Sequence, residues 1–77
     1  MFYVYFLKKP KFKYVYIGFT DDLQRRMREH KKDKPGYKLV YYEAYLSKKD
    51  ARERERKLKQ REQTIRRLKE RLKDSFK

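Results

Sequence analysis

The chain has 77 residues, of which 25 are Lys or Arg and 11 are Asp or Glu, so its formal net charge is +14. A chain this short buries only about 60% of its unfolded surface, which excludes two cores and predicts one domain over residues 1–77. The absence of cysteine and the single histidine exclude disulfides, Cys-based zinc sites and multi-histidine metal sites.

The excess of positive charge indicates a polyanionic partner. Aromatic residues make up 17% of the chain, which argues against a disordered basic tail and for a folded domain. The longest uncharged stretch, residues 14–20, is far shorter than the roughly 20 residues of a membrane span. The start of the chain also lacks the basic lead-in of a secretory signal. We therefore expect a soluble, cytoplasmic protein with no membrane partner, and favour a monomer.

Two strands at the N-terminus are expected to form a hairpin. Phe2 to Leu7 and Tyr14 to Phe19 are rich in β-branched and aromatic residues, and the short link between them allows antiparallel pairing. Because side chains alternate between faces, one face of this hairpin is rich in tyrosine. Gly18 lies inside the second strand, where glycine costs about 0.5–1 kcal/mol relative to alanine. Its position predicts a close approach to the backbone.

A helix is expected after the hairpin. The run Thr20-Asp21-Asp22 supplies a capping side chain and acidic residues for a first turn, and the helix should extend to about Lys32. Helical spacing gives an inner stripe of Leu23, Arg26, Met27 and His30. Arg26 and His30 are thus polar side chains at positions that should face the sheet, which points to function.

The rest of the chain predicts one more strand and a helical end. Pro35-Gly36 predicts a turn, and Leu39 to Tyr45 reads as a third strand. From Lys48 onward there is no Gly or Pro, so a long helix or two abutting helices should follow. Its apolar stripe is interrupted on the same face by Glu55 and comprises Ala51, Leu58, Ile65, Leu68 and Leu72. The expected class is α+β with a long C-terminal helical region.

Four polar side chains suit phosphodiester cleavage. The reaction needs a positioned water, a cation for the charge on the phosphoryl oxygens and help for the leaving oxygen. Arg26 can bind phosphate with two N–H groups, and Tyr16 can orient or deprotonate water if cations lie near it. His30 can act as acid or base near neutral pH. Glu55, with waters and phosphate oxygens, can hold one Mg²⁺.

Each of these side chains has a structural alternative. Arg26 can be an exposed surface arginine, and His30 can interact with the negative end of its helix. The chain has eight tyrosines, and any one of them can be a half-buried strand residue. Glu55 can form a helix-surface salt bridge with Lys59 or Arg52. The C-terminal stripe can likewise bind an acidic membrane or a partner helix instead of covering the sheet.

The order and spacing of these residues resemble the GIY-YIG nuclease family from about Tyr3 to Lys59. The two tyrosine motifs of that family appear as Tyr3-Val4-Tyr5 and Tyr16-Ile17-Gly18. Compact single-domain bacterial members also share a basic helix ending in His, a Leu-Val-Tyr-Tyr-Glu strand and an Ala-x-x-x-Glu-x-x-x-Lys helix. These features recur here at Arg26, His30, Leu39 to Glu43 and Ala51 to Lys59.

The resemblance implies a small three-stranded antiparallel sheet flanked by helices, and cleavage of DNA with one Mg²⁺ or Mn²⁺ ion. Carried onto matching positions, it assigns catalytic roles to Tyr5, Tyr16, Arg26 and His30, and the metal ligand to Glu55. Residues expected to contact the nucleic acid are Gly18, Arg25 and Lys59.

A geometric expectation follows from these assignments: Tyr16, Arg26 and Glu55 should line one concave, positively charged surface. Glu55 on the opposite side of the sheet from Tyr16 would contradict a one-metal nuclease and leave the alternative function, a non-catalytic basic module that binds nucleic acid with the same fold, as the better interpretation. The regular Lys/Glu/Arg pattern after Lys59 would also suit an engineered sequence.

Overall fold

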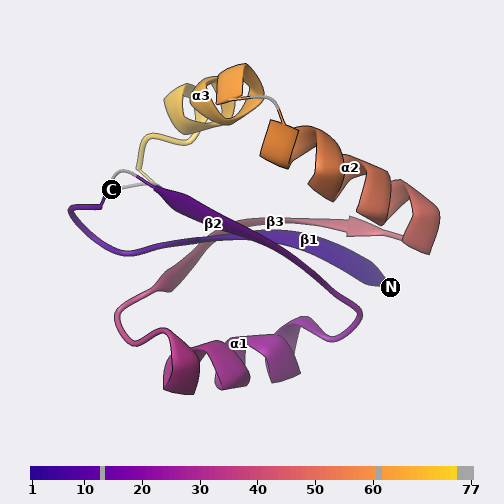
Figure 1. Cartoon of the computed structure of the whole chain (residues 1–77), viewed down its shortest axis with the longest axis horizontal. Helices are drawn as coiled ribbons and strands as arrows, with labels where there is room; N and C mark the ends of the chain where they lie inside the picture. Colours follow the sequence, from indigo (N-terminus) through magenta and orange to yellow (C-terminus); the bar gives the residue numbers. More distant parts are fainter. Residues whose placement is uncertain (13, 61, 75–77) are drawn as a thin grey trace.

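The computed structural model describes residues 1–12, 14–60 and 62–74, which form three strands and three helices. Their order is β1 (Phe2–Lys8), β2 (Val15–Thr20), α1 (Leu23–Asp33), β3 (Lys38–Tyr45), α2 (Lys48–Gln60) and α3 (Glu62–Arg71). The strands form one sheet in the order β2-β1-β3, in which β1 pairs antiparallel with both neighbours. Helix α1 covers one face, whereas α2 and α3 cover the other (Figure 1). The expected α+β class with a flanked three-stranded antiparallel sheet is confirmed.

The central strand β1 is buried on both faces of the sheet. Each of its residues from Val4 to Leu7 is at most 1% exposed. Val4 and Phe6 point to the α2 side, where they join Ile17 of β2, Ala51 and Leu58 in the main hydrophobic core. The alternate positions of β1 and β2, which include the tyrosines of both motifs, therefore point to the α1 side.

The apolar stripe of the C-terminal region covers the sheet. Ile65, Leu68 and Leu72 pack against the main core. The stripe is therefore occupied within the domain and does not form a free amphipathic surface. In the described part of the chain, no helix has the length and apolar character needed to cross a membrane.

The C-terminal region is not the long helix of the first expectation: it divides into two shorter helices, which was the second alternative. Helix α2 has 13 residues and α3 has 10. One straight helix over residues 48–74 would be about 40 Å long at 1.5 Å per residue, more than the 33 Å longest extent of the domain. It would carry Ile65 and Leu68 beyond the sheet, and the division returns them to the core.

The start of α1 is fixed by two capping interactions. Oδ1 of Asp22 accepts the backbone N–H of Arg25 at 3.1 Å, and the hydroxyl of Thr20 accepts the N–H of Asp22 at 3.1 Å. Asp22 is therefore the N-cap, and the acidic residues precede the first turn instead of occupying it. With the helix start fixed in this way, the predicted stripe turns Arg26 and buried His30 toward the sheet.

Candidate active site

Tyr5 is the centre of a hydrogen-bonded cluster between β1 and α1. Its hydroxyl shares a hydrogen bond of 2.8 Å with Nε2 of His30 and accepts a second one, of 3.3 Å, from Nε of Arg26. The two partners lie one turn apart on α1. Tyr5 is fully buried and His30 is 6% exposed. The structure thus brings together three of the predicted catalytic residues.

Gly18 provides the space that the Tyr5 ring occupies. The two residues are cross-strand partners in the β1–β2 pair. A β-carbon on Gly18 would lie 2.3 Å from both Cζ and the hydroxyl oxygen of Tyr5, so the Tyr5 ring would have to shift to make room for it. The close approach expected at Gly18 is therefore made by Tyr5. Its expected contact with nucleic acid stays a prediction.

The environment of the cluster sets the protonation of its members. Burial raises the pKa of Tyr5, and the hydrogen bond from Arg26 only partly opposes this, so the hydroxyl keeps its proton at neutral pH. Burial lowers the pKa of His30, and the positive charges of Arg26 and Lys34 lower it further. His30 is therefore neutral at pH 7. Its Nδ1 is buried and has no hydrogen-bond partner among the described residues.

Tyr16 lies beside this cluster on the outer strand β2. The centroid of its ring is 5.4 Å from that of His30 and 6.3 Å from that of Tyr5. Nζ of Lys34 lies 4.6 Å from the centroid of the same ring. Unlike Tyr5, the Tyr16 side chain is only half-buried and can meet solvent.

Glu55 lies in the other layer of the molecule. It is on α2, in the layer opposite α1, where Tyr16 contacts His30 (Figure 1). The expectation that Tyr16, Arg26 and Glu55 line one concave surface is therefore wrong for Glu55. The sequence alternation separated the two faces of the sheet correctly, but it did not say which helix covers which face. Because β2 is an outer strand, a ligand can still reach both layers around its edge.

The carboxylate of Glu55 is held by two cations of its own helix. One oxygen lies 3.6 Å from Nη1 of Arg52 and the other 3.3 Å from Nζ of Lys59, and the Glu55 side chain is 14% exposed. These contacts are the ones that the structural alternative predicted. Lys59 and Arg25 are both exposed, and their expected contact with nucleic acid stays a prediction.

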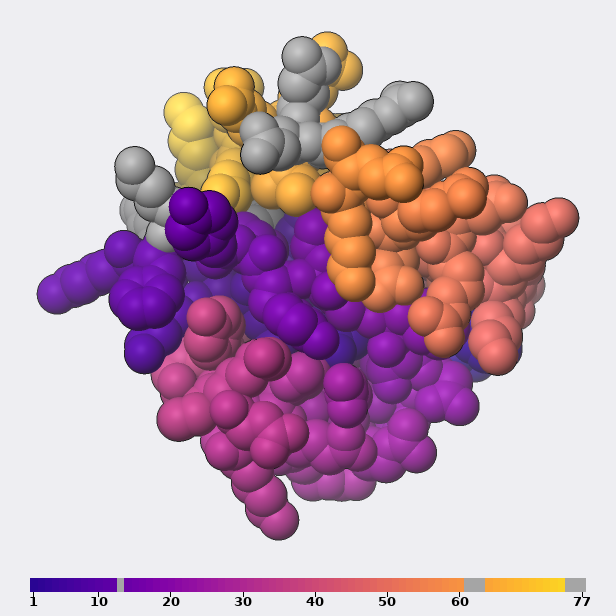
Figure 2. All heavy atoms as spheres, viewed as in Figure 1, coloured from indigo at the N-terminus to yellow at the C-terminus, as the bar shows by residue number. Residues whose placement is uncertain are grey.

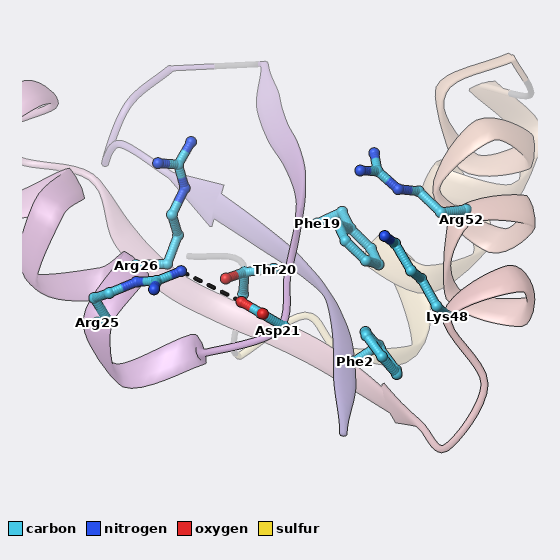
Figure 3. A pocket seen from close by; sticks show the side chains of 8 residues that line it. All are labelled: Phe2, Phe19, Thr20, Asp21, Arg25, Arg26, Lys48 and Arg52. Atoms are coloured by element: carbon cyan, nitrogen blue, oxygen red, sulfur yellow. Dashed lines mark hydrogen bonds and ion pairs between the residues drawn. The ribbon is translucent and has the colours of Figure 1, made fainter.

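A hollow of about 270 Å³ opens where β2 ends and connects the two helical layers (Figure 3). Its cations come from α1 and from α2, on opposite sides of the strand. The lining residues are Phe2, Phe19, Thr20, Asp21, Arg25, Arg26, Lys48 and Arg52. In the space-filling view, side chains of the hairpin stay visible between the α1 and α2 layers (Figure 2). With four cations and one carboxylate, the hollow favours an anion.

A second polar cluster, centred on Glu43, was missed by the sequence analysis. The Glu43 carboxylate accepts hydrogen bonds from Tyr41 at 2.7 Å and Tyr45 at 2.5 Å, and from Nε and Nη2 of Arg54 at 2.9 and 3.2 Å. The pKa of both tyrosines is raised to about 12, mainly by burial and secondly by the hydrogen bond to Glu43. Burial alone would raise the pKa of Glu43, but the bonds from Arg54 and the tyrosines outweigh it. The tyrosines two positions before and after Glu43 could have predicted this cluster, because they share its face.

The described residues offer limited support for a metal ion. No group of three or more His, Cys, Asp or Glu side chains is placed to hold one in the described ranges. Glu55 fits as a single carboxylate ligand, because its ion-pair partners Arg52 and Lys59 are exposed side chains that can move away. Mg²⁺ is commonly held in this manner, with one or two carboxylates, waters and substrate phosphate.

Comparison with known proteins gives the chain its family. A family model described as the GIY-YIG catalytic domain matches residues 1–71. Neither the curated proteins nor the solved structures give a significant match. The matched residues span both tyrosine motifs, α1 with Arg26 and His30, and α2 with Glu55. The chain therefore belongs to the GIY-YIG nuclease family.

Proposed function

We propose that the protein is a metal-dependent endonuclease that hydrolyses phosphodiester bonds in DNA. The observation that carries this proposal is the buried cluster of Tyr5, Arg26 and His30 on the tyrosine face of the sheet. A purely structural domain would place apolar side chains at these inner positions of α1. A phosphate-binding arginine held by a buried tyrosine supports chemistry on phosphate instead.

Arg26 acts on the phosphate. Its Nε is bound to Tyr5 and its Nη1 donates to Glu29 at 2.8 Å, which fixes the guanidinium while the side chain stays partly exposed. The hydrogen bonds to Tyr5 and Glu29 raise its pKa, so it is always charged. In the hydrolysis, the oxygen of water forms a bond to phosphorus and an ester P–O bond breaks. Arg26 stabilises the charge that develops on the phosphoryl oxygens.

Tyr16 is the residue best placed to hold the attacking water. Its ring is half-buried on an outer strand, whereas the hydroxyl of Tyr5 is enclosed and already bonded to two partners. Tyr5 is therefore a positioning residue for Arg26. His30, neutral at pH 7, packs against both tyrosine rings and fixes their places.

Glu55 is the residue that would hold the divalent ion. When bound, the ion would neutralise phosphate charge and assist the departure of the leaving oxygen. Because Glu55 and Tyr16 lie in opposite layers, the scissile phosphate must sit at the edge of β2, where both layers can be reached.

A second function, the binding module, is favoured by the position of Glu55, which lies on the side of the sheet that was expected to contradict a one-metal nuclease. The nuclease stays the first proposal because the matching family model is that of a catalytic domain. The location of Glu55 in the other layer and its contacts with Arg52 and Lys59 suit a basic module that binds nucleic acid without cleaving it. The net charge of +14 gives affinity for phosphates whether or not the site is active.

The two functions differ in their need for metal. The purified protein should nick supercoiled plasmid DNA with Mg²⁺ or Mn²⁺, lose this activity with a chelator, and lose it in Glu55→Ala. Binding of a labelled DNA duplex in chelator should persist and weaken as salt rises. Nicking no faster than that of Glu55→Ala, with binding retained, would leave the binding module as the function.

A further inference from the structure

The hollow at the end of β2 combines cations from two helices that the sheet keeps apart. Arg25 and Arg26 approach it from α1, and Lys48 and Arg52 approach it from α2 (Figure 3). Of these four, Arg26 is expected to stabilise the scissile phosphate and Arg25 to contact the nucleic acid. Neither of the α2 cations has an assigned role.

The α1 cations of the hollow are already neutralised in part. Arg25 pairs with Asp21 at 3.3 Å and with Glu29 at 3.5 Å, and Arg26 pairs with Glu29 at 2.8 Å. Among the described residues, Lys48 has no ion pair, and Arg52 has only a long one, of 3.6 Å, to Glu55. The α2 side of the hollow therefore carries the less compensated charge.

Two stacked phenylalanine rings orient Arg52 of α2. The guanidinium carbon of Arg52 lies 4.0 Å from the centroid of the Phe19 ring, and Phe2 is stacked on that ring with 6.2 Å between centroids and an interplanar angle of 13°. A cation held over an aromatic face keeps the edges of its guanidinium free to bind an anion. Its order also reduces the entropy that binding would cost.

The hollow and Tyr16 lie at different points along β2, and Arg26 is the residue that belongs to both, because it lines the hollow and contacts Tyr5 beside Tyr16. Thr20 lines the hollow and follows Tyr16 by four residues on the same strand, a separation of about 13 Å at 3.3 Å per residue. A DNA strand advances about 3.4 Å per nucleotide along the helix axis, so the two places suit phosphates a few nucleotides apart.

We propose that this hollow binds a backbone phosphate flanking the scissile one, with Lys48 and Arg52 as its contacts on α2. Binding of the flanking phosphate anchors the DNA along the edge of β2. Tyr16 and Arg26 then act on the scissile phosphate of the same DNA strand. The assignment rests on the proposed function for its substrate class, but it concerns binding and can be measured without cleavage.

The test is the salt dependence of DNA binding in chelator, where no metal-dependent cleavage occurs. Affinity for a fluorescein-labelled duplex of 16 base pairs is measured by anisotropy between about 50 and 200 mM salt. Lys48→Ala and Arg52→Ala are compared with Lys57→Ala and Arg67→Ala, which remove the same charge from exposed positions outside the hollow. If circular dichroism shows that Arg52→Ala is poorly folded, Arg52→Gln, which keeps a planar group over Phe19, takes its place in the comparison.

The plot of log affinity against log salt has a negative slope. Loss of one phosphate contact should make this slope shallower by about 0.9 for each hollow variant. Affinity at low salt should fall about three- to tenfold beyond the fall seen in the two controls. Equal slopes and affinities in hollow and control variants would overturn the assignment. A wild-type protein that binds as described but never nicks DNA would overturn only the nuclease function and leave the phosphate site standing.

Discussion

The ring of Tyr5 lies directly over the backbone of Gly18, so closely that a β-carbon on Gly18 would be 2.3 Å from the tyrosine hydroxyl. Gly18→Ala should therefore destabilise the protein, because the buried ring cannot move without losing its bonds to Arg26 and His30. Overpacking of this kind costs about 1–3 kcal/mol, which exceeds the gain of about 0.5–1 kcal/mol from replacing a strand glycine. Urea unfolding measures the difference.

The Tyr5→Leu background provides the control for this prediction, because a leucine does not reach the space where the phenol ring lies. In the Tyr5→Leu background, Gly18→Ala should lower the free energy of unfolding only slightly or even raise it. An equal cost in both backgrounds would show that Tyr5 is not the reason for glycine at this position.

The stability of the fold should depend on the protonation of His30. Its pKa is lower in the folded protein than the ordinary value of about 6.5, so the unfolded chain takes up the proton first. The stability contributed by neutral His30 is present above about pH 6.5 and is lost as pH falls through the folded pKa. The free energy of unfolding should thus decrease from pH 7.5 to pH 5, and less so in His30→Gln. As the chain has one histidine, its NMR titration is unambiguous, and a folded pKa above 6.5 would contradict this account.

Much of the fold follows from local pattern in the sequence. The three strands, the start of α1 and the stripe with Arg26 and His30 were predicted because alternation, capping and helical spacing act within a few residues. The position of the break after Gln60 was not predicted, because no Gly or Pro marks it and the sequence left one long helix and two abutting helices open.

The placement of the site residues was predictable only in part. The tyrosine motifs and α1 assemble as expected, because their spacing and register are short-range. Glu55 was placed wrongly because the face that a helix covers depends on long-range packing. The apolar face of Val4, Phe6 and Ile17 selects the helix with an apolar stripe, and that helix carries Glu55 to the side away from Tyr16.

Arg54 should be important for stability, although no family motif singles it out. It donates two hydrogen bonds to Glu43, whose carboxylate is 16% exposed and ties α2 to β3. Arg54→Met leaves that carboxylate with only the two tyrosine donors, and should cost about 1–3 kcal/mol after allowance for partial exposure. Arg56→Met, at an exposed position of the same helix, is the matched control in urea unfolding. Similar losses in both variants would refute a special role for this pair.

Arg52 should compete with a metal ion for Glu55. Its guanidinium lies 3.6 Å from a carboxylate oxygen, a separation at which unit charges interact by about 1 kcal/mol in water. Arg52→Leu should therefore bind Mn²⁺ about two- to fivefold more tightly, as followed by the electron paramagnetic resonance signal of free Mn²⁺. Arg56→Leu removes the same charge elsewhere on α2 and should change the affinity less. Unchanged or weaker binding in Arg52→Leu would argue against Glu55 as the metal ligand.

The most direct test of the nuclease site compares two arginines of α1 in plasmid nicking with Mg²⁺ or Mn²⁺. Arg26 contacts Tyr5 and lines the hollow. Arg28, two residues later, is exposed and is not one of the residues that line the hollow. Arg26→Ala should lower the nicking rate roughly 10²–10³-fold, the loss typical of one group that stabilises the transition state. Arg28→Ala should nick at close to the wild-type rate. Equal rates for Arg26→Ala and the wild-type protein would contradict the assignment of catalysis to the cluster of Tyr5, Arg26 and His30.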